Sequence, residues 1–174
     1  MARRGRHGGF CEEAAARGDW CHCIMDGDTI ASYGWYATGA VPALDDIWIR
    51  FSPSYLYMYK GFTSPAYRGL KLHAYGMARA AAHAVDNGYR GPISFVEVQN
   101  EGSLRSVARL GYRIFGTCPQ VCVAGKTLAH RTQGCAPYGF ELFVPEDAEP
   151  PSDRTPRSGR RAPRSDALAS GPPR

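Results

Sequence analysis

The stretch GFTSPAYRGLKLHAYG, from Gly61 to Gly76, contains residues that could bind an anion where a strand gives way to a helix. Pro65 favours a turn, and Gly69 lets the backbone approach a ligand closely. The first turn of a helix presents N–H groups without intrahelical partners, and the helix dipole favours an anion there. On these residues alone, a phosphate site and an ordinary strand-to-helix turn with a surface arginine are equally good interpretations.

The side chains of this stretch depart from a glycine-rich phosphate loop. Lys71 and His73 stand where such a loop usually has glycines, whereas Arg68 and Lys71 would add positive charge against a phosphate. Because the donors are main-chain groups, side chains that point outward are compatible with binding. We expect His73 and His83 at the surface of the helix.

Strands and a tight turn precede this stretch. The runs CHCIM and TIASYGWYA are joined by Asp26-Gly27-Asp28, and an Asp-Gly pair between apolar runs predicts a β-hairpin. Two further runs, ALDDIWIRF and SYLYMYKGF, are rich in β-branched and aromatic residues. They predict strands with a break at Pro53.

A helical period begins after Gly69. Apolar residues recur at helical spacing, at Leu70, Ala74, Met77, Ala78, Ala81 and Val85. Asn87-Gly88 predicts the end of this helix. The run ISFVEV predicts a short buried strand, and Asn100 is a suitable N-cap for a second helix that ends at Gly111. YRIFG and YGFELFV predict two late strands.

These elements predict an α/β fold with a mixed sheet, in which the segment from Tyr55 to Val98 is a right-handed strand–helix–strand crossover. We expect one domain over residues 20–144, preceded by a short N-terminal arm or helix over 1–19. Residues 145–174 are rich in Pro and Arg and poor in large apolar residues, so we expect a disordered tail.

The composition bears on compartment and partners. The net charge of +5 comes partly from the arginine-rich ends, so nucleic acid is an unlikely partner. No apolar run approaches the ~20 residues that span a bilayer, and the basic start MARRGRHGGF has no apolar stretch behind it. We therefore expect a cytoplasmic protein without membrane contact.

The six cysteines are compatible with a zinc site, but their spacing does not favour one. Cys21 and Cys23 are separated by one residue rather than the usual two to four, and Cys118 and Cys122 form the other close pair. On a strand, the spacing of the first pair puts both thiols on one face. Without a signal peptide a disulfide framework is not expected, and we predict no bound metal.

From Tyr67 to Gly116 the chain resembles the GNAT superfamily of acyl-CoA N-acyltransferases. The resemblance rests on Pro65-x-Tyr67-Arg68-Gly69 before a helix, Asn100 with Ser103 after a strand, and Arg109-Leu110-Gly111-Tyr112 before another strand. It covers about residues 20 to 116. It implies a GNAT-like, mostly antiparallel sheet whose central parallel strand pair, here 55–63 and 93–98, splits to hold CoA, with helices on the flanks.

The resemblance also implies roles for these residues. Pantetheine would pair with the backbone of Phe62 and Thr63, and Asn100 would lie near it or cap the helix. The pyrophosphate would meet the loop N–H groups, at Arg68, Gly69, Leu70, Lys71, Leu72 and His73. The implied reaction is direct attack of an amine on the thioester of acetyl-CoA, which needs a proton acceptor and a group that protonates the leaving thiolate.

The proton carriers are less well marked. Many relatives have a tyrosine in the last helix that protonates the thiolate, and that position is Val107 here. Ser103, Ser106 or solvent could replace it. Glu97 is the candidate base, with Tyr57 or Tyr59 as the other choice, and our catalytic candidates are Glu97, Tyr59 and Ser103.

Three functions are compatible with these residues. The first is an acetyltransferase acting on a small-molecule or sugar amine rather than on a protein. The second is a non-catalytic CoA-binding or regulatory module, which the altered loop and Val107 favour. The third, a nucleic-acid-binding domain, lacks a recognisable motif. Because few residues precede the hairpin, the acceptor site is expected to be open, closed by a second copy in a homodimer, or incomplete.

Overall fold

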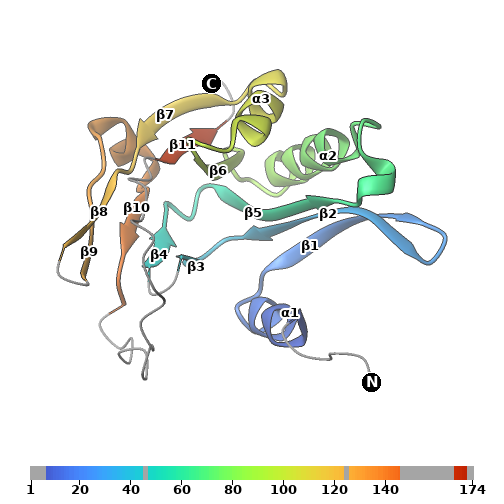
Figure 1. The fold of residues 1–174 in the computed structure, drawn as a ribbon, viewed down its shortest axis with the longest axis horizontal. Coiled ribbons are helices and arrows are strands. Elements are labelled where there is room, and N and C mark those ends of the chain that lie inside the picture. The colour runs from blue at the N-terminus through green and yellow to red at the C-terminus, as the bar shows by residue number, and fades with distance from the viewer. Residues whose placement is uncertain (1–6, 45–46, 124–125, 146–166, 172–174) are drawn as a thin grey trace, which may run out of the picture.

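The computed structural model of the chain describes residues 7–44, 47–123, 126–145 and 167–171. Three α-helices and two short 3-10 helices are present in these ranges (Figure 1): α1 (His7–Ala16), α2 (Leu72–Asp86), α3 (Glu101–Arg109), η1 (Pro65–Tyr67) and η2 (Gln133–Tyr138). The long strands are β1 (Trp20–Asp26), β2 (Thr29–Ala37), β5 (Leu56–Thr63) and β6 (Pro92–Glu97). The shorter strands are β3 (Val41–Leu44), β4 (Ile47–Arg50), β7 (Arg113–Thr117), β8 (Gln120–Val123), β9 (Lys126–Ala129), β10 (Glu141–Phe143) and β11 (Ala167–Gly171).

The central sheet has the strand order β1-β2-β5-β6-β11-β7. Strands β5 and β6 pair in parallel, and the other neighbouring strands of this sheet pair antiparallel. The helices α2 and α3 lie on one side of the sheet and α1 lies on the other (Figure 1). This arrangement confirms the predicted mixed, mostly antiparallel sheet with a central parallel pair and flanking helices.

The hairpin of β1 and β2 forms as its turn residues predict. Gly27 at the turn has φ +55°, a conformation that glycine adopts readily. Pairing runs from Asp26↔Thr29 at the turn to Trp20↔Tyr36 at the open end. Strand β1 is therefore the edge of the central sheet, and β5 pairs antiparallel with β2.

A β-bulge interrupts the pairing of β2 with β5. Tyr33 pairs with Phe62 and Trp35 with Tyr59, so Lys60 and Gly61 together oppose the single residue Gly34. Lys60 has φ +47°, which is uncommon for a residue with a side chain. Such a bulge bends the strand and re-aims its side chains. Here the Lys60 Nζ lies 4.1 Å from the ring centroid of Phe10 on α1.

Helix α2 packs on the sheet through small residues. Its buried positions are Gly76, Met77, Ala80 and Ala84, whereas Val85 is exposed. The predicted apolar face included Leu70 and Val85, but both side chains face solvent. The buried face of the helix therefore differs from the predicted one. Gly88, at φ +81°, follows the helix end as predicted. Alanines and a glycine let the helix approach the sheet closely enough to cover Leu56 and Met58.

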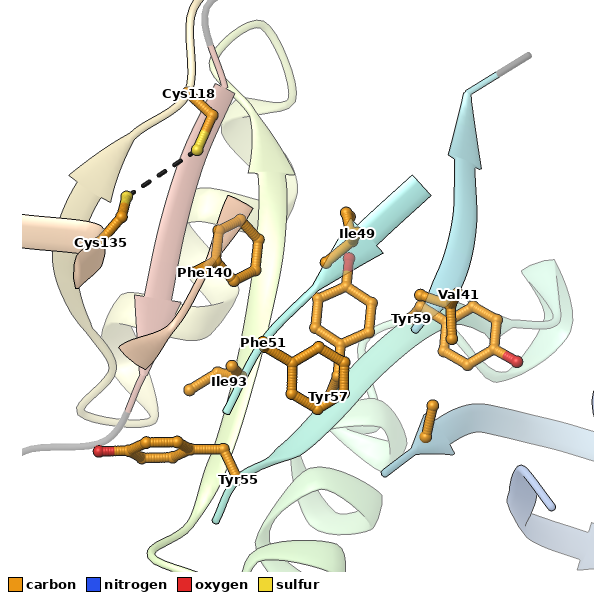
Figure 2. Close-up of a cluster of buried hydrophobic side chains, with 11 residues drawn as sticks. Val41, Ile49, Phe51, Tyr55, Tyr57, Tyr59, Ile93, Cys118, Cys135 and Phe140 are labelled. Carbon is orange, nitrogen blue, oxygen red and sulfur yellow. Dashed lines mark hydrogen bonds between the residues drawn. The ribbon is translucent and has the colours of Figure 1, made fainter. Parts of the chain in front are cut away.

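The opposite face of the sheet carries an aromatic core (Figure 2). Tyr57 and Tyr59 of β5, with Tyr55 just before the strand, alternate along the chain and point to this face. Phe51 lies against Tyr57 with ring centroids 5.3 Å apart. Strands β10, β4 and β3 form a second sheet that supplies Val41 and Ile49 to the same core. The predicted single strand ALDDIWIRF is therefore two strands, β3 and β4, outside the central sheet.

The C-terminal region differs from its prediction in one segment. Residues 167–171 were expected to be disordered, but they form β11, which pairs antiparallel with both β6 and β7 (Figure 1). Their backbone groups pair with both neighbouring strands. This pairing stabilises the segment without large apolar side chains. The rest of the predicted tail, apart from residue 145, lies outside the described residues.

Candidate functional site

Strands β5 and β6 separate after a short paired segment. Their parallel pairing runs through Leu56↔Pro92, Tyr57↔Ile93 and Met58↔Ser94, although β5 continues to Thr63 and β6 to Glu97. The bulge at Lys60 falls just past the last pair. The second half of β5 therefore has β2 on one side and an open edge toward β6. An extended molecule could pair with that edge as an added strand does.

The separation opens a cavity of about 390 Å³, which we call the split cavity. Its walls are the two diverging strands, the first turn of α2, the start of α3, and Pro42, Ala43 and Ile49 of the second sheet. The predicted catalytic residues Tyr59, Glu97 and Ser103 all line it. The fold thus brings together side chains that lie far apart in the sequence.

The loop between β5 and α2 provides the predicted anion donors only in part. Gly69 has φ +84° and Lys71 has φ +58°, so the chain turns sharply before α2 begins at Leu72. The backbone N–H of Tyr75 donates to the carbonyl of Lys71 at 3.0 Å. The N–H groups of Leu72, His73 and Ala74 therefore have no intrahelical partner and are available to an anion.

Arg68 is already engaged. Its backbone N–H donates to the carbonyl of Pro65 at 3.3 Å, which closes the 3-10 turn. Its Nε donates to the carbonyl of Thr63 at 3.4 Å. The predicted backbone donor at this position is thus used within the loop. The guanidinium lies beside the end of β5, where its charge still favours an anion.

These loop residues line a second cavity of about 690 Å³, the loop cavity. The predicted cofactor-binding residues in its wall are Phe62, Thr63, Arg68, Gly69, Lys71, Leu72, His73 and Asn100. Leu70 does not line it, because its side chain faces solvent. Gly61, His73, Asn100 and Ser103 line both cavities, so the loop cavity adjoins the split cavity.

Asn100 is the N-cap of α3. Its Oδ1 accepts a hydrogen bond from the backbone N–H of Ser103 at 3.1 Å, which satisfies one free donor of the helix. This confirms the predicted cap. Because the same residue lines both cavities, the cap also fixes where β6 ends and where Ser103 stands.

Tyr59 is held by the connection between α1 and β1. Its hydroxyl donates to Asp19 at 2.6 Å and accepts from Arg17 at 3.3 Å, and these two partners also form an ion pair. Burial, followed by the hydrogen bond to Asp19, raises the pKa of Tyr59 well above the usual tyrosine range. The hydrogen bond to Asp19 and the raised pKa both favour the protonated hydroxyl, which does not favour the predicted role as a base.

His73 lies in the site rather than on the surface, where the sequence had placed its side chain. A Cβ added at Gly61 would lie 2.3 Å from the His73 Cε1, so the ring packs directly against the backbone of β5. Burial lowers the pKa of His73 below the ordinary histidine value of 6.5. The sequence did hold one signal for this contact, because a glycine inside a strand often marks a close approach.

The remaining candidates differ in their surroundings. Val107 is buried and lines the split cavity with an apolar side chain, so this position offers no proton. Glu97 is exposed at the end of β6. Ser106 lines the loop cavity alone, whereas Ser103 lines both cavities.

The cysteines form two close pairs. Cys21 and Cys23 lie on one face of β1 with Sγ atoms 3.4 Å apart, as their spacing predicted. Cys118 lies 3.9 Å from Cys135 in the aromatic core (Figure 2), and the side chain of Cys122 is outside the described part of the chain. Among the described residues, no group of three or more His, Cys, Asp and Glu side chains could hold a metal ion. No helix in the described ranges is long and apolar enough to cross a membrane.

The chain matches known proteins by structure but not by sequence. No protein-family model matches the chain, and no curated protein matches it by sequence. Solved acetyltransferases do match. An IAA acetyltransferase from Bacillus cereus superposes with a TM-score of 0.55 at 9% identity, over 94% of this chain and 83% of that one.

Two further structures agree with this match. The ribosomal-protein-S18-alanine N-acetyltransferase from Escherichia coli gives a TM-score of 0.53 at 11% identity, over 99% of this chain and 79% of that one. A GNAT-family protein from Desulfovibrio desulfuricans gives 0.50 at 15% identity, over 73% and 75%. These matches, together with the mixed sheet and its central parallel pair, mean that this chain has the GNAT acyl-CoA N-acyltransferase fold.

Proposed function

We propose that the protein transfers an acetyl group from acetyl-CoA to an amine by direct attack. The observation that carries this proposal is the adjoining pair of cavities, which joins the start of α2, with its N–H groups that lack intrahelical partners, to an open strand edge. A molecule with a diphosphate, an extended amide-bearing arm and a reactive end would suit this order of features. The fold shared with N-acetyltransferases supports the same assignment.

The residues of the loop would hold the phosphates. The free N–H groups of Leu72, His73 and Ala74 offer hydrogen bonds, and the side chains of Arg68 and Lys71 add positive charge. The edge of β5 that faces away from β2, from Gly61 to Thr63, would pair with the amides of the pantetheine arm. These contacts involve mostly backbone, so they tolerate the departures of the loop from a glycine-rich sequence.

The reacting end would then lie in the split cavity. Glu97 lines that cavity and would take the proton that an ammonium group must lose before it can attack. The acceptor we propose is a small-molecule or sugar amine, because a cavity of about 390 Å³ lies at the lower end of the usual range for small ligands. The walls formed by Pro42, Ala43 and Ile49 would contact the acceptor's apolar part.

A non-catalytic CoA-binding module is the second candidate. Two observations favour it: Val107 supplies no proton, and the Tyr59 hydroxyl is bound to Asp19 and Arg17. Thiol release from acetyl-CoA with a panel of primary amines separates the two functions. CoA binding by calorimetry without turnover on any amine would support the module.

A double variant tests the phosphate site. Arg68→Glu with Gly69→Pro reverses the charge and forces φ near −65° where the loop needs +84°, so we expect at least a 100-fold loss of CoA affinity. Arg79→Glu is the matched control, since it makes the same charge change on the exposed side of α2. Circular dichroism would check the fold, and unchanged CoA affinity in the folded double variant would overturn the site.

A further inference from the structure

We propose that the acceptor is an amino acid, an amine whose carboxylate is bound by the Lys60 ammonium group. This inference rests on the proposed acetyl transfer and names its substrate class. Among the described residues, Lys60 of β5 and Glu97 of β6 are the only Lys, Arg, Asp or Glu side chains that line the split cavity. Neither lines the loop cavity, where the phosphates would bind. The two charges therefore belong to the end of the site that would receive the acceptor.

The β-bulge sets the direction of the Lys60 side chain. Tyr59 belongs to the aromatic core, and in a regular strand the next residue would point to the other face of the sheet. With φ +47° at the bulge, Lys60 instead places its Nζ 4.1 Å from the ring centroid of Phe10. That ring packs edge-on against Tyr59 and Trp35, with centroids 6.1 and 5.3 Å apart. The ammonium group of Lys60 thus lies on the same face as the aromatic core.

Glu97 lies on this face too. Side chains alternate along β6, and Ile93 and Phe95 both contribute to the aromatic core. Glu97 continues the alternation at the exposed end of the strand. Neither Glu97 nor Lys60 forms an ion pair with another residue in the described part of the chain. The two diverging strands therefore bring one cation and one anion, both unpaired, to the same side of the cavity.

A zwitterionic acceptor matches this arrangement. Glu97, the proposed base, would meet the ammonium group of the acceptor, and Lys60 would form a charge-assisted hydrogen bond with its carboxylate. The Phe10 ring holds the long lysine side chain, which reduces the entropy that is lost when a ligand binds. An ammonium group has three N–H donors, so the ring contact leaves donors for a ligand. An amine without an acid group would gain nothing from Lys60.

Matched acceptors test this preference in the wild type. The acids are leucine and β-alanine, and their controls are leucinamide and β-alaninamide, in which a neutral amide replaces the carboxylate. We expect kcat/KM for thiol release from acetyl-CoA to be at least about tenfold higher for an acid than for its amide. Loss of the carboxylate charge lowers the pKa of the neighbouring amine, so the amide has more free amine at neutral pH. The chemistry of the amine therefore works against the expected result.

Lys60→Met tests where the carboxylate binds, because methionine removes the charge and keeps an apolar stem against Phe10. We expect kcat/KM for the acids to fall about 10–100-fold, the effect of one hydrogen bond between charged groups, and that for the amides to change less than about twofold. Arg79→Met removes an exposed charge from α2 and should leave all four values unchanged. CoA affinity, measured by calorimetry, should be the same in both variants as in the wild type.

Lys60→Glu tests the same site by a gain of activity. Two carboxylates would then face the acceptor, so the variant should prefer a diamine. We expect the ratio of kcat/KM for putrescine to kcat/KM for β-alanine to rise at least about 100-fold over the wild-type ratio. A variant that is only less stable would lose activity on both acceptors and keep the ratio.

Three results would overturn the inference. The first is a wild type that uses the amides as well as the acids, and the second is a preference for acids that survives in Lys60→Met. The third is an unchanged ratio in Lys60→Glu. Any of these, in a protein that binds CoA and releases thiol, overturns the carboxylate site alone. Failure to bind CoA, or to release thiol with every amine, overturns the proposed acetyl transfer as well.

Discussion

At the scale of single residues, neighbouring side chains decide which of the candidate groups can act. Tyr59 and Glu97 line the same cavity, yet the Tyr59 hydroxyl donates a hydrogen bond to Asp19 while Glu97 is exposed at a strand end. Residue type alone could not separate them. The difference arises from α1, whose connection to β1 brings Arg17 and Asp19 to the tyrosine hydroxyl.

Removal of the Tyr59 hydroxyl separates a structural from a catalytic role. We expect Tyr59→Phe to lower the free energy of unfolding by about 1 kcal/mol, because one hydrogen bond to a carboxylate is lost. The rate of acetyl transfer should stay within twofold. Urea unfolding and thiol release measure the two effects, with Tyr33→Phe on β2 as control. A rate loss above tenfold in Tyr59→Phe would restore tyrosine as a catalytic group.

The half-buried His73 makes stability depend on pH. Its pKa is lowered in the folded state, so between the lowered value and 6.5 the unfolded chain binds more protons than the native one. The free energy of unfolding contributed at this site therefore falls as pH falls below 6.5. We expect His73→Gln to lose this part of the slope relative to wild type in urea unfolding at pH 5 to 7.5. Parallel slopes in the two proteins would contradict the burial of the ring.

At the scale of elements, the starts of α2 and α3 position the site by different means. Helix α3 is capped by a side chain, whereas the N-cap of α2, Lys71, has a left-handed conformation and no side-chain cap. An uncapped helix start leaves its N–H groups to a ligand. The sequence predicted both starts, because a strand-to-turn-to-helix order and an asparagine cap are local signals.

The cap of α3 can be tested without touching α2. Asn100→Ala should lower the free energy of unfolding by about 1 kcal/mol, the usual cost of an N-cap, and should shift the start of α3 within the site. Asn100→Asp keeps an acceptor for the Ser103 N–H and should retain the wild-type stability. Chemical denaturation checks both variants. Equal losses in the two would mean that the cap does not stabilise the helix.

Other features of the elements could not be predicted from the sequence. Alternation and periodicity located the hairpin, helices α2 and α3, and strands β5 and β6, because these patterns act over a few residues. These patterns do not say which strands pair with each other, so the second sheet of β3, β4 and β10 was not predicted. The placement of His73 depends on Gly61 across the helix–sheet interface. That contact is tertiary and has no local pattern.

At the scale of the whole molecule, the sheet separates two cores. Leu56 and Met58 face the helices, while Tyr55, Tyr57 and Tyr59 face the second sheet and α1. The split cavity reaches both faces, with Met58 and Val107 on one side and Tyr57 and Ile49 on the other. The acyl carrier and the acceptor could thus approach from different sides of the sheet.

Strand β11 joins β6 to β7, so its backbone should matter more than its side chains. Ala169 pairs with Phe95 on one side and Gly116 on the other. Ala169→Pro removes an N–H from the interior of a sheet, and we expect a loss of roughly 1–3 kcal/mol in the free energy of unfolding. Ala169→Ser keeps the N–H and should stay near wild type. Thermal and urea unfolding measure these stabilities. A proline variant as stable as the wild type would mean that β11 does not pair.

The place of β11 in the sheet has a consequence for biosynthesis. Ala167 pairs with Glu97, so β6 and β7 are made long before the strand that lies between them. On the ribosome, the growing chain would carry two unpaired strand edges, which are prone to association with other chains. We therefore expect nascent chains that stop before residue 167 to depend on chaperones, and release of the completed chain to end that dependence.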